Sequence, residues 1–174
     1  MAAINSLAQR IADANKEIAR AKGVGHDPND LLDHRDQLLR DLNKYVQTSL
    51  IEADDGSMGV FLANSQPLVL GQLASPVSLV QSDFTDPATT KLAMQRGGTT
   101  VPLDEAILGG GSVAGLLRYK NTDLVDAGNL LGRMALAIGG TMNAQQALGL
   151  TLDGQQGKPL FAVPASVKGL SSNT

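Results

Sequence analysis

The sequence has no cysteine and no tryptophan, and aromatic residues make up only 3% of its 174 positions. Without cysteine there is no disulfide framework, no thiolate nucleophile and no cysteine-based zinc site. The scarcity of aromatic side chains removes the stacking platforms on which sugar-binding and single-strand-binding proteins depend. A small-molecule site is therefore disfavoured.

A surplus of basic residues and a long apolar run are also lacking. The sequence contains fourteen Lys and Arg residues and seventeen Asp and Glu residues, so its net charge is −3. This balance disfavours nucleic acid as a partner. No apolar stretch approaches a transmembrane span, and the first residues lack a signal-peptide core, so we expect no membrane partner. The hydrophobic content of 43% is enough for a core in one ordinary domain or two small ones.

Two helices are predicted at the start of the chain. A stripe with three-four spacing predicts a helix over residues 3–22, formed by Ile4, Leu7, Ile11, Ala14, Ile18 and Ala21. Gly23 and Gly25 should end it. A second helix follows Pro28, with Asp27 as its expected cap and a wider stripe through Leu31, Arg35, Leu38, Leu42 and Tyr45. The short link between the helices predicts an antiparallel hairpin.

The apolar period then alternates, which predicts short strands. Asp55-Gly56 is a hairpin signal, because glycine tolerates the positive φ that such turns require. A further pair of strands is expected over residues 91–95 and 99–103, on either side of Arg96-Gly97-Gly98. We therefore expect a β region with few bulky core residues.

Helical spacing returns after Gly109-Gly110-Gly111-Ser112, which we interpret as a flexible joint followed by an N-cap serine. The predicted third helix spans Val113 to Gln146, and its stripe includes Leu117, Leu124, Leu131 and Met134. The fold class is therefore α+β: an antiparallel helical bundle with heptad-patterned helices and an inserted antiparallel β subdomain. We expect Leu38 and Leu131 to lie in facing seams of that bundle.

The predicted domains follow from this reading. Residues 1–47 and 112–148 form a discontinuous helical bundle domain, and residues 48–111 form the β subdomain. Residues 149–174 form a loop or hairpin tail that is partly flexible, because turn residues surround its one apolar run.

One cluster resembles a metal site and consists of His26, Asp27, Asp30, Asp33, His34 and Asp36. A structural interpretation is favoured, because Asp27 and Asp30 serve as cap and first-turn charge. Gly109–Ser112 could imitate a phosphate-binding loop, but it lacks the following lysine and a preceding parallel strand. No catalytic, cofactor-binding or metal-binding residue is predicted, and an enzyme is disfavoured.

The segment from Asn29 to Leu39, NDLLDHRDQLL, closely resembles the signature NDLLDQRDQLL of the flagellar hook-associated protein 1 family. The resemblance resumes at residues 111–117 and 129–137 and extends to Pro159-Leu160-Phe161. The chain departs from the family at His34, where glutamine is usual, and at Ser65, where glycine is frequent. Family members also carry N- and C-terminal heptad segments that are missing here, so the chain resembles a central fragment. The signature and packing residues are Asn29, Asp30, Leu31, Leu32, Arg35, Asp36, Leu38, Leu39, Leu117, Leu124, Leu131 and Met134.

The resemblance implies a structural component of the bacterial flagellum, an adaptor at the junction between hook and filament. It implies an extracellular location after export without a cleaved signal peptide, and self-association in a ring in the full-length protein. Hook protein, other hook-associated proteins and an export chaperone are the implied partners, the chaperone through the missing terminal segments. The fragment itself is expected to be monomeric. The alternative is a helical binding module of a secretion apparatus or surface appendage that recognises a partner helix.

Overall fold

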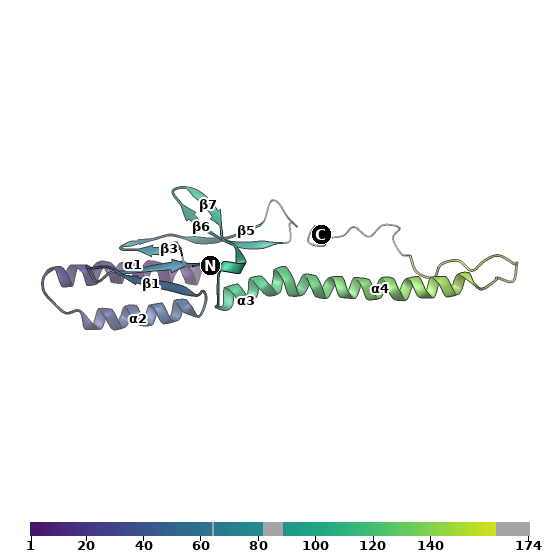
Figure 1. The fold of residues 1–174 in the computed structure, drawn as a ribbon, viewed down its shortest axis with the longest axis horizontal. Helices are drawn as coiled ribbons and strands as arrows, with labels where there is room; N and C mark the ends of the chain where they lie inside the picture. The colour runs from purple at the N-terminus through teal and green to yellow at the C-terminus, as the bar shows by residue number, and fades with distance from the viewer. Residues whose placement is uncertain (64, 82–88, 163–174) are drawn as a thin grey trace. The chain divides into compact units, whose positions relative to one another are not determined.

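The structure is a computed structural model that describes residues 1–63, 65–81 and 89–162 (Figure 1). The chain divides into two compact units, Met1–Tyr119 and Lys120–Thr174. Unit 1 contains helices α1 (Ala2–Gly23), α2 (Asn29–Asn43) and α3 (Ser112–Arg118), together with a 3₁₀ turn at Glu105–Ile107. A π-helical turn (Tyr119–Asp123) leads into α4 (Leu124–Ala147), the helix of unit 2.

The strands of unit 1 form two antiparallel sheets. The first has the order β1-β2-β3-β4 and the second the order β5-β6-β7. Their bounds are β1 Thr48–Glu52, β2 Met58–Leu62, β3 Gln66–Leu70, β4 Leu73–Ala74, β5 Val77–Gln81, β6 Thr90–Arg96 and β7 Thr99–Pro102. The predicted α+β class is therefore confirmed.

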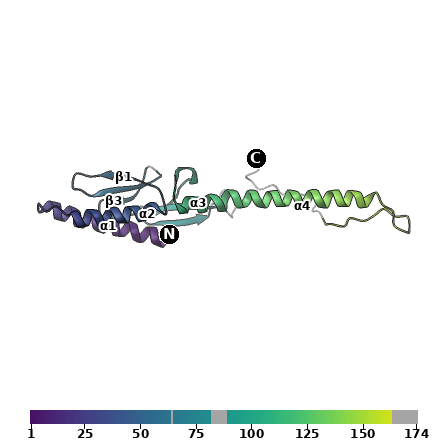
Figure 2. The ribbon, with the colours of Figure 1, turned by 90° about the horizontal axis from the view of Figure 1, so that it is seen from below.

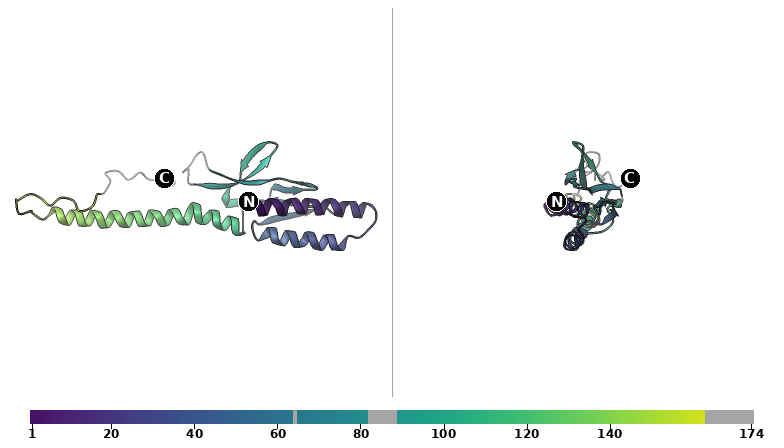
Figure 3. Two further views of the ribbon diagram at one scale, coloured as in Figure 1. Left: turned by 180° about the vertical axis from the view of Figure 1, so that it is seen from behind. Right: turned by 90° about the vertical axis from the view of Figure 1, so that its left-hand side faces the viewer.

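The helical hairpin forms where the sequence predicts it. α1 exceeds the predicted range by one residue at each end, and α1 and α2 run side by side in opposite directions (Figure 3). The buried side of α1 is its apolar stripe, broadened by Ala8, Ala12 and Asn15. The predicted cap is wrong: no side chain caps α2, because Pro28 occupies the N-cap position and Asp27 contributes only its backbone carbonyl, to the amide of Asn29.

Both predicted turn signals are confirmed. Gly56 has φ of +80° in the turn between β1 and β2, where Leu50 pairs with Val60. Gly97 and Gly98 have φ of +54° and +83° between the paired strands β6 and β7. Glycine is needed at these positions, because side chains rarely tolerate such backbone angles.

The helices and both sheets share one core. Its buried residues come from α1, α2, α3 and the strands, for example Ile11, Leu42, Val60, Leu92 and Leu117. Figure 2 shows β1 and β3 as a layer beside the α1–α2 pair. The boundaries of the compact units thus differ from those of the predicted domains, because sheet and helices bury their apolar faces against each other. That residues 112–148 join residues 1–47 in one bundle domain stays a prediction.

The predicted third helix is present and contains one irregular turn. Residues 112–147 are helical, but the π-helical turn divides α3 from α4. The described part of the predicted tail is held by a bridge between Leu150 and Gln156 and by turns, while residues 163–174 lie outside the described residues.

Candidate functional site

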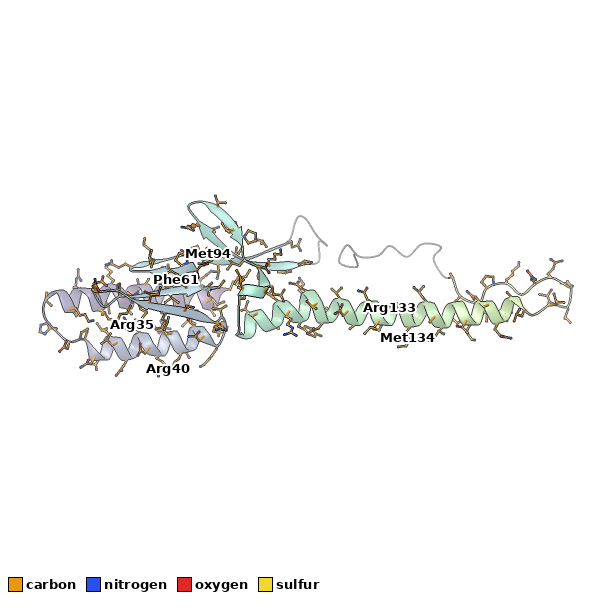
Figure 4. All side chains as sticks on the ribbon, in the orientation of Figure 1. Arg35, Arg40, Phe61, Met94, Arg133 and Met134 are labelled. Carbon is orange, nitrogen blue, oxygen red and sulfur yellow. The ribbon has the colours of Figure 1, made fainter. Side chains whose placement is uncertain are left out.

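The signature segment lies on α2 and serves packing on one side. Arg35, Leu38 and Leu39 are buried, Leu31 and Leu32 are half-buried, and Asn29, Asp30 and Asp36 are exposed. Figure 4 shows Arg35 on the side of α2 that faces α1, whereas Arg40 lies on the opposite side. The signature therefore places its apolar residues and one arginine against the rest of unit 1.

Arg35 forms a hydrogen bond with the turn between β1 and β2. Its Nη1 donates a hydrogen bond of 2.7 Å to the carbonyl oxygen of Gly56, while its Nε is buried without a hydrogen-bond partner. The carboxylate of the exposed Asp36 lies 3.9 Å from this Nε. The side chain of Lys22 crosses Gly56 so closely that a Cβ there would overlap it. Arg35 thus holds the hairpin turn by a hydrogen bond, and the side chain of Lys22 packs against the same turn.

Asp55, in the same turn, is fixed by hydrogen bonds with Ser57. The amide of Ser57 donates to Asp55 Oδ1 at 2.9 Å. Hydrogen bonds from the Ser57 side chain and then its backbone, with a smaller contribution from the charge of Lys22, lower the pKa of Asp55. A hydrogen bond of 2.7 Å from Lys44 similarly lowers the pKa of Asp41, and Asp41 raises the pKa of Lys44. The pair of Asp41 and Lys44 is on the surface, where such contacts add little stability, whereas Ser57 is buried.

Two asparagines of α1 join the helix to the sheets. Asn15 is fully buried, and its side-chain amide donates 2.8 Å hydrogen bonds to the carbonyls of Met58 and Gly71. Its Oδ1 accepts a hydrogen bond from the amide of Met58. Asn5 binds Val77 in the same way, through both the amide and the carbonyl of that residue. The apolar stripe did not identify either asparagine, although Asn15 lies one helical turn after Ile11.

The glycine segment before α3 is a fixed connection and not the predicted flexible joint. The backbone amide of Gln47 donates a hydrogen bond of 3.0 Å to the carbonyl of Gly110. In return, the backbone amide of Gly110 donates a hydrogen bond of 2.8 Å to the side-chain Oε1 of Gln47. Ser112 is the first residue of α3 and its side chain makes no capping bond, so the predicted N-cap is wrong. The helix-start amides point to backbone carbonyls, which leaves them unavailable to a phosphate.

The cluster that resembles a metal site in the sequence does not assemble. Within residues 1–63, 65–81 and 89–162, no three His, Asp or Glu side chains gather where they could hold a metal ion. His26 and Asp27 lie in the link between the helices, and Asp33, His34 and Asp36 are exposed on α2. Asp30 supplies negative charge to the first turn, as predicted.

Unit 2 presents an apolar helix. Of the 24 residues of α4, all of which the structure describes, only Asp126 and Arg133 are charged and only Gly139 is buried. The exposed fractions are 65% for Leu131, 58% for Met134 and 53% for Leu124, whereas that of Leu38 is 2%. Leu131 is thus exposed in unit 2, and its placement opposite Leu38 stays a prediction. α4 has apolar residues around its circumference and no single seam. Figure 4 labels Arg133 and Met134 on this helix.

Asn143 of α4 forms hydrogen bonds with the segment that follows the helix. Its Oδ1 accepts hydrogen bonds from the amides of Leu160 and Phe161, at 2.8 and 2.9 Å, and its amide group donates to the Phe161 carbonyl at 2.8 Å. Gly157 passes so close to the Gln146 carbonyl that a Cβ would overlap it. Large apolar side chains nevertheless remain exposed here, namely Leu148, Leu150, Leu152, Leu160 and Phe161.

A helix that is apolar on all sides and uncovered in its own unit is typical of proteins that work within an assembly. No helix in the described ranges is long and apolar enough to cross a membrane. The fold and these surfaces define a structural domain with an apolar helix that is exposed in its own unit.

The family model described as the flagellar hook-associated protein FlgK helical domain matches residues 1–161, and the chain belongs to this family. The chain is 37% identical to flagellar hook-associated protein 1 of Salmonella typhimurium, over 99% of its own length and 32% of that protein. It is 36% identical to the protein of the same name from Escherichia coli K12, over 92% of the chain and 30% of that protein.

A solved structure shows the same fold. The flagellar hook junction protein FlgK from Burkholderia pseudomallei superimposes with a TM-score of 0.82 at 34% identity, over 94% of this chain and 30% of that one. The chain thus spans about a third of the length of the relatives it matches.

Proposed function

We propose that this chain is the helical-domain part of a structural component of the bacterial flagellum that acts as an adaptor between hook and filament. The observation that carries the proposal is the 37% identity, over 99% of the chain, to a flagellar hook-associated protein. The Burkholderia relative is itself described as a flagellar hook junction protein. The proposed location is extracellular, in the flagellum.

A structural role agrees with the chemistry of the described residues. Buried polar side chains of unit 1 bind backbone groups of the same unit, as Asn15 does with Met58 and Arg35 Nη1 does with Gly56. Such contacts stabilise a fold but offer no acid, base or nucleophile to a substrate. We therefore propose a protein that is not an enzyme.

The partners belong to the proposal as well. In the longer protein we expect self-association in a ring, contacts with hook protein and other hook-associated proteins, and a chaperone bound during export. The apolar surface of α4 supports such contacts, because burial of large side chains such as Leu131 and Met134 is favourable. We also propose that residues 112–148 belong with residues 1–47 to one helical domain of that protein.

The alternative is a binding module that recognises a partner helix, and the same observation on α4 favours it. The 174-residue chain alone is expected to be monomeric at micromolar concentration under the junction proposal. Sedimentation of the chain tests this expectation, and a stable ring or filament from the chain alone would contradict it.

The function is tested by segment replacement. The aligned part of the Salmonella typhimurium protein is exchanged for this chain and expressed in a strain that lacks the native gene. Restored filament assembly and swimming are expected. A matched variant with Leu131→Asp and Met134→Asp should be exported but fail to assemble, whereas Asp126→Asn should assemble. A chimera that folds and is exported, yet never localises to the hook tip, would overturn the proposal.

A further inference from the structure

The end of α2 and the start of α3 bind each other through their backbones. The amide of Ser112 donates to the carbonyl of Lys44 at 3.0 Å, and the amide of Val113 donates to the carbonyl of Tyr45 at 2.9 Å. Figures 1 and 2 show α3 beginning beside the end of α2. The first amides of a helix have no partner within that helix, and here the carbonyls of Lys44 and Tyr45, in the turn directly after α2, supply partners for those of α3. The opposite partial charges of the two helix ends favour the same contact.

Gly111 allows this approach. Its φ is +101°, and a Cβ at this position would lie 2.5 Å from the carbonyl oxygen of Tyr45. A side chain would therefore force the two helix ends apart. Gly109 also has positive φ, +69°, so two of the three consecutive glycines occupy backbone conformations that other residues rarely adopt.

Few other contacts hold α3. Of its seven residues, all described, only Leu117 is buried, and Val113 and Ala114 are partly buried. The chain just before the glycines is anchored by the buried side chain of Leu108. α1, by contrast, buries seven residues and is tied to both sheets by Asn5 and Asn15. A segment with few buried apolar contacts and exposed hydrogen bonds belongs to the low-stability part of a fold.

We propose that α3 is a latch, held on unit 1 by its backbone joint with α2 and by Leu117, that opens while α1, α2 and both sheets stay folded. In the closed state the glycine segment is fixed by Gln47, and opening breaks the bonds of Gly110 with Gln47 together with those of Ser112 and Val113. Gly109, Gly110 and Gly111 then allow the rotation, because glycine tolerates many backbone conformations and Leu108 keeps the preceding segment in the core. The inference concerns conformational change within unit 1 and does not depend on the flagellar function.

Native-state hydrogen exchange of the 174-residue chain tests the latch. Amides from Gly115 to Arg118 should exchange at least about tenfold faster than buried amides of α1 around Ile11, and their rates should barely respond to low urea. A small urea response reports an opening that exposes little surface. Equal rates and equal urea responses in α3 and α1 would overturn the proposal, because the helices would then open only together.

A proline at residue 112 tests the joint itself. Proline suits the first position of an isolated helix, and ψ of 165° at Gly111 is compatible with a following proline. Ser112→Pro, however, removes the amide that binds Lys44, whereas Ser112→Ala keeps it. Exchange in α3 should be about fivefold faster in the proline variant than in the alanine variant, as loss of one backbone hydrogen bond predicts.

The proline variant should leave exchange in α1 and β6 unchanged. No difference between the two variants in α3 would show that the joint does not hold the latch. Equal acceleration in α3, α1 and β6, or loss of folding, would show that α3 is part of the global folding unit. Either result would overturn the proposal.

Discussion

Asn15 of α1 binds both the amide and the carbonyl of Met58 in β2, at 2.9 and 2.8 Å, as a neighbouring strand would. The helix thereby takes part in the hydrogen bonding of the sheet. Asn5 does the same for Val77 in β5, so one helix binds a strand in each sheet.

Asn15→Ala should lower the free energy of unfolding by about 3 kcal/mol, because two carbonyls and one amide lose their partners and buried unpaired polar groups cost about 1–3 kcal/mol each. Urea denaturation measures the loss. Gln9→Ala on the exposed side of α1 is the matched control and should stay within about 0.5 kcal/mol of the parent. Equal stability of the two variants would contradict the structural role of Asn15.

Leu38 and Leu131 should respond differently to truncation. Leu38→Ala leaves a cavity in the core of unit 1 and should cost about 2–5 kcal/mol. Leu131→Ala removes an exposed side chain of α4 and should change the stability of the 174-residue chain by less than about 0.5 kcal/mol. Thermal and urea unfolding measure both. A large loss at Leu131 would show that α4 is covered within the chain itself.

The turn at Asp55 should stabilise unit 1 in a pH-dependent way. Its pKa in the folded state lies below the ordinary value of 3.8. The contribution of the carboxylate is therefore present above the unfolded-state pKa and is lost as pH falls through the folded-state pKa. Asp55→Ala should be less stable than the control Asp54→Ala at pH 6, and this gap should shrink below about pH 3. Urea unfolding at both pH values measures the gap, and a gap that grows on acidification would refute the assignment.

Asn143→Ala should release the segment at residues 157–161 from α4. Loss of its three hydrogen bonds predicts amide exchange at Leu160 and Phe161 that is faster by at least about tenfold. Gln145→Ala, on the same helix, should leave these rates unchanged. Because Asn143 belongs to unit 2, exchange at buried amides of unit 1 should not change in either variant. Unaltered rates at Leu160 in Asn143→Ala would mean that other contacts hold the segment.

Repeating patterns made much of the fold predictable. The spacing of Ile4, Ile11 and Ile18 predicted α1, and the Asp55-Gly56 and Gly97-Gly98 turns predicted two hairpins, because each depends on local backbone preferences. The resemblance of residues 29–39 to a known signature indicated the family.

Long-range polar contacts could not be predicted in this way. Nothing in the order of residues pairs Asn15 with Met58, and the joint between Lys44 and Ser112 uses backbone atoms that every residue possesses. The glycines before α3 were interpreted as flexible, because glycine favours both mobile links and close approaches of the backbone. The seven-residue period of the third predicted helix could not show how much of α4 is covered, because such a period is the same whether the covering helix lies inside or outside the chain.

The joint between α2 and α3 also sets an order of folding. α1 and α2 are neighbours in sequence and can pair early, because closing a short loop costs little entropy. Lys44 and Ser112 meet only after the intervening chain has formed its sheets and returned to the end of α2. In a chain that folds from one end, α3 is therefore the last helix of unit 1 to be placed. Interrupted synthesis or cleavage after β7 would leave the carbonyls of Lys44 and Tyr45, just after α2, without their partners in α3.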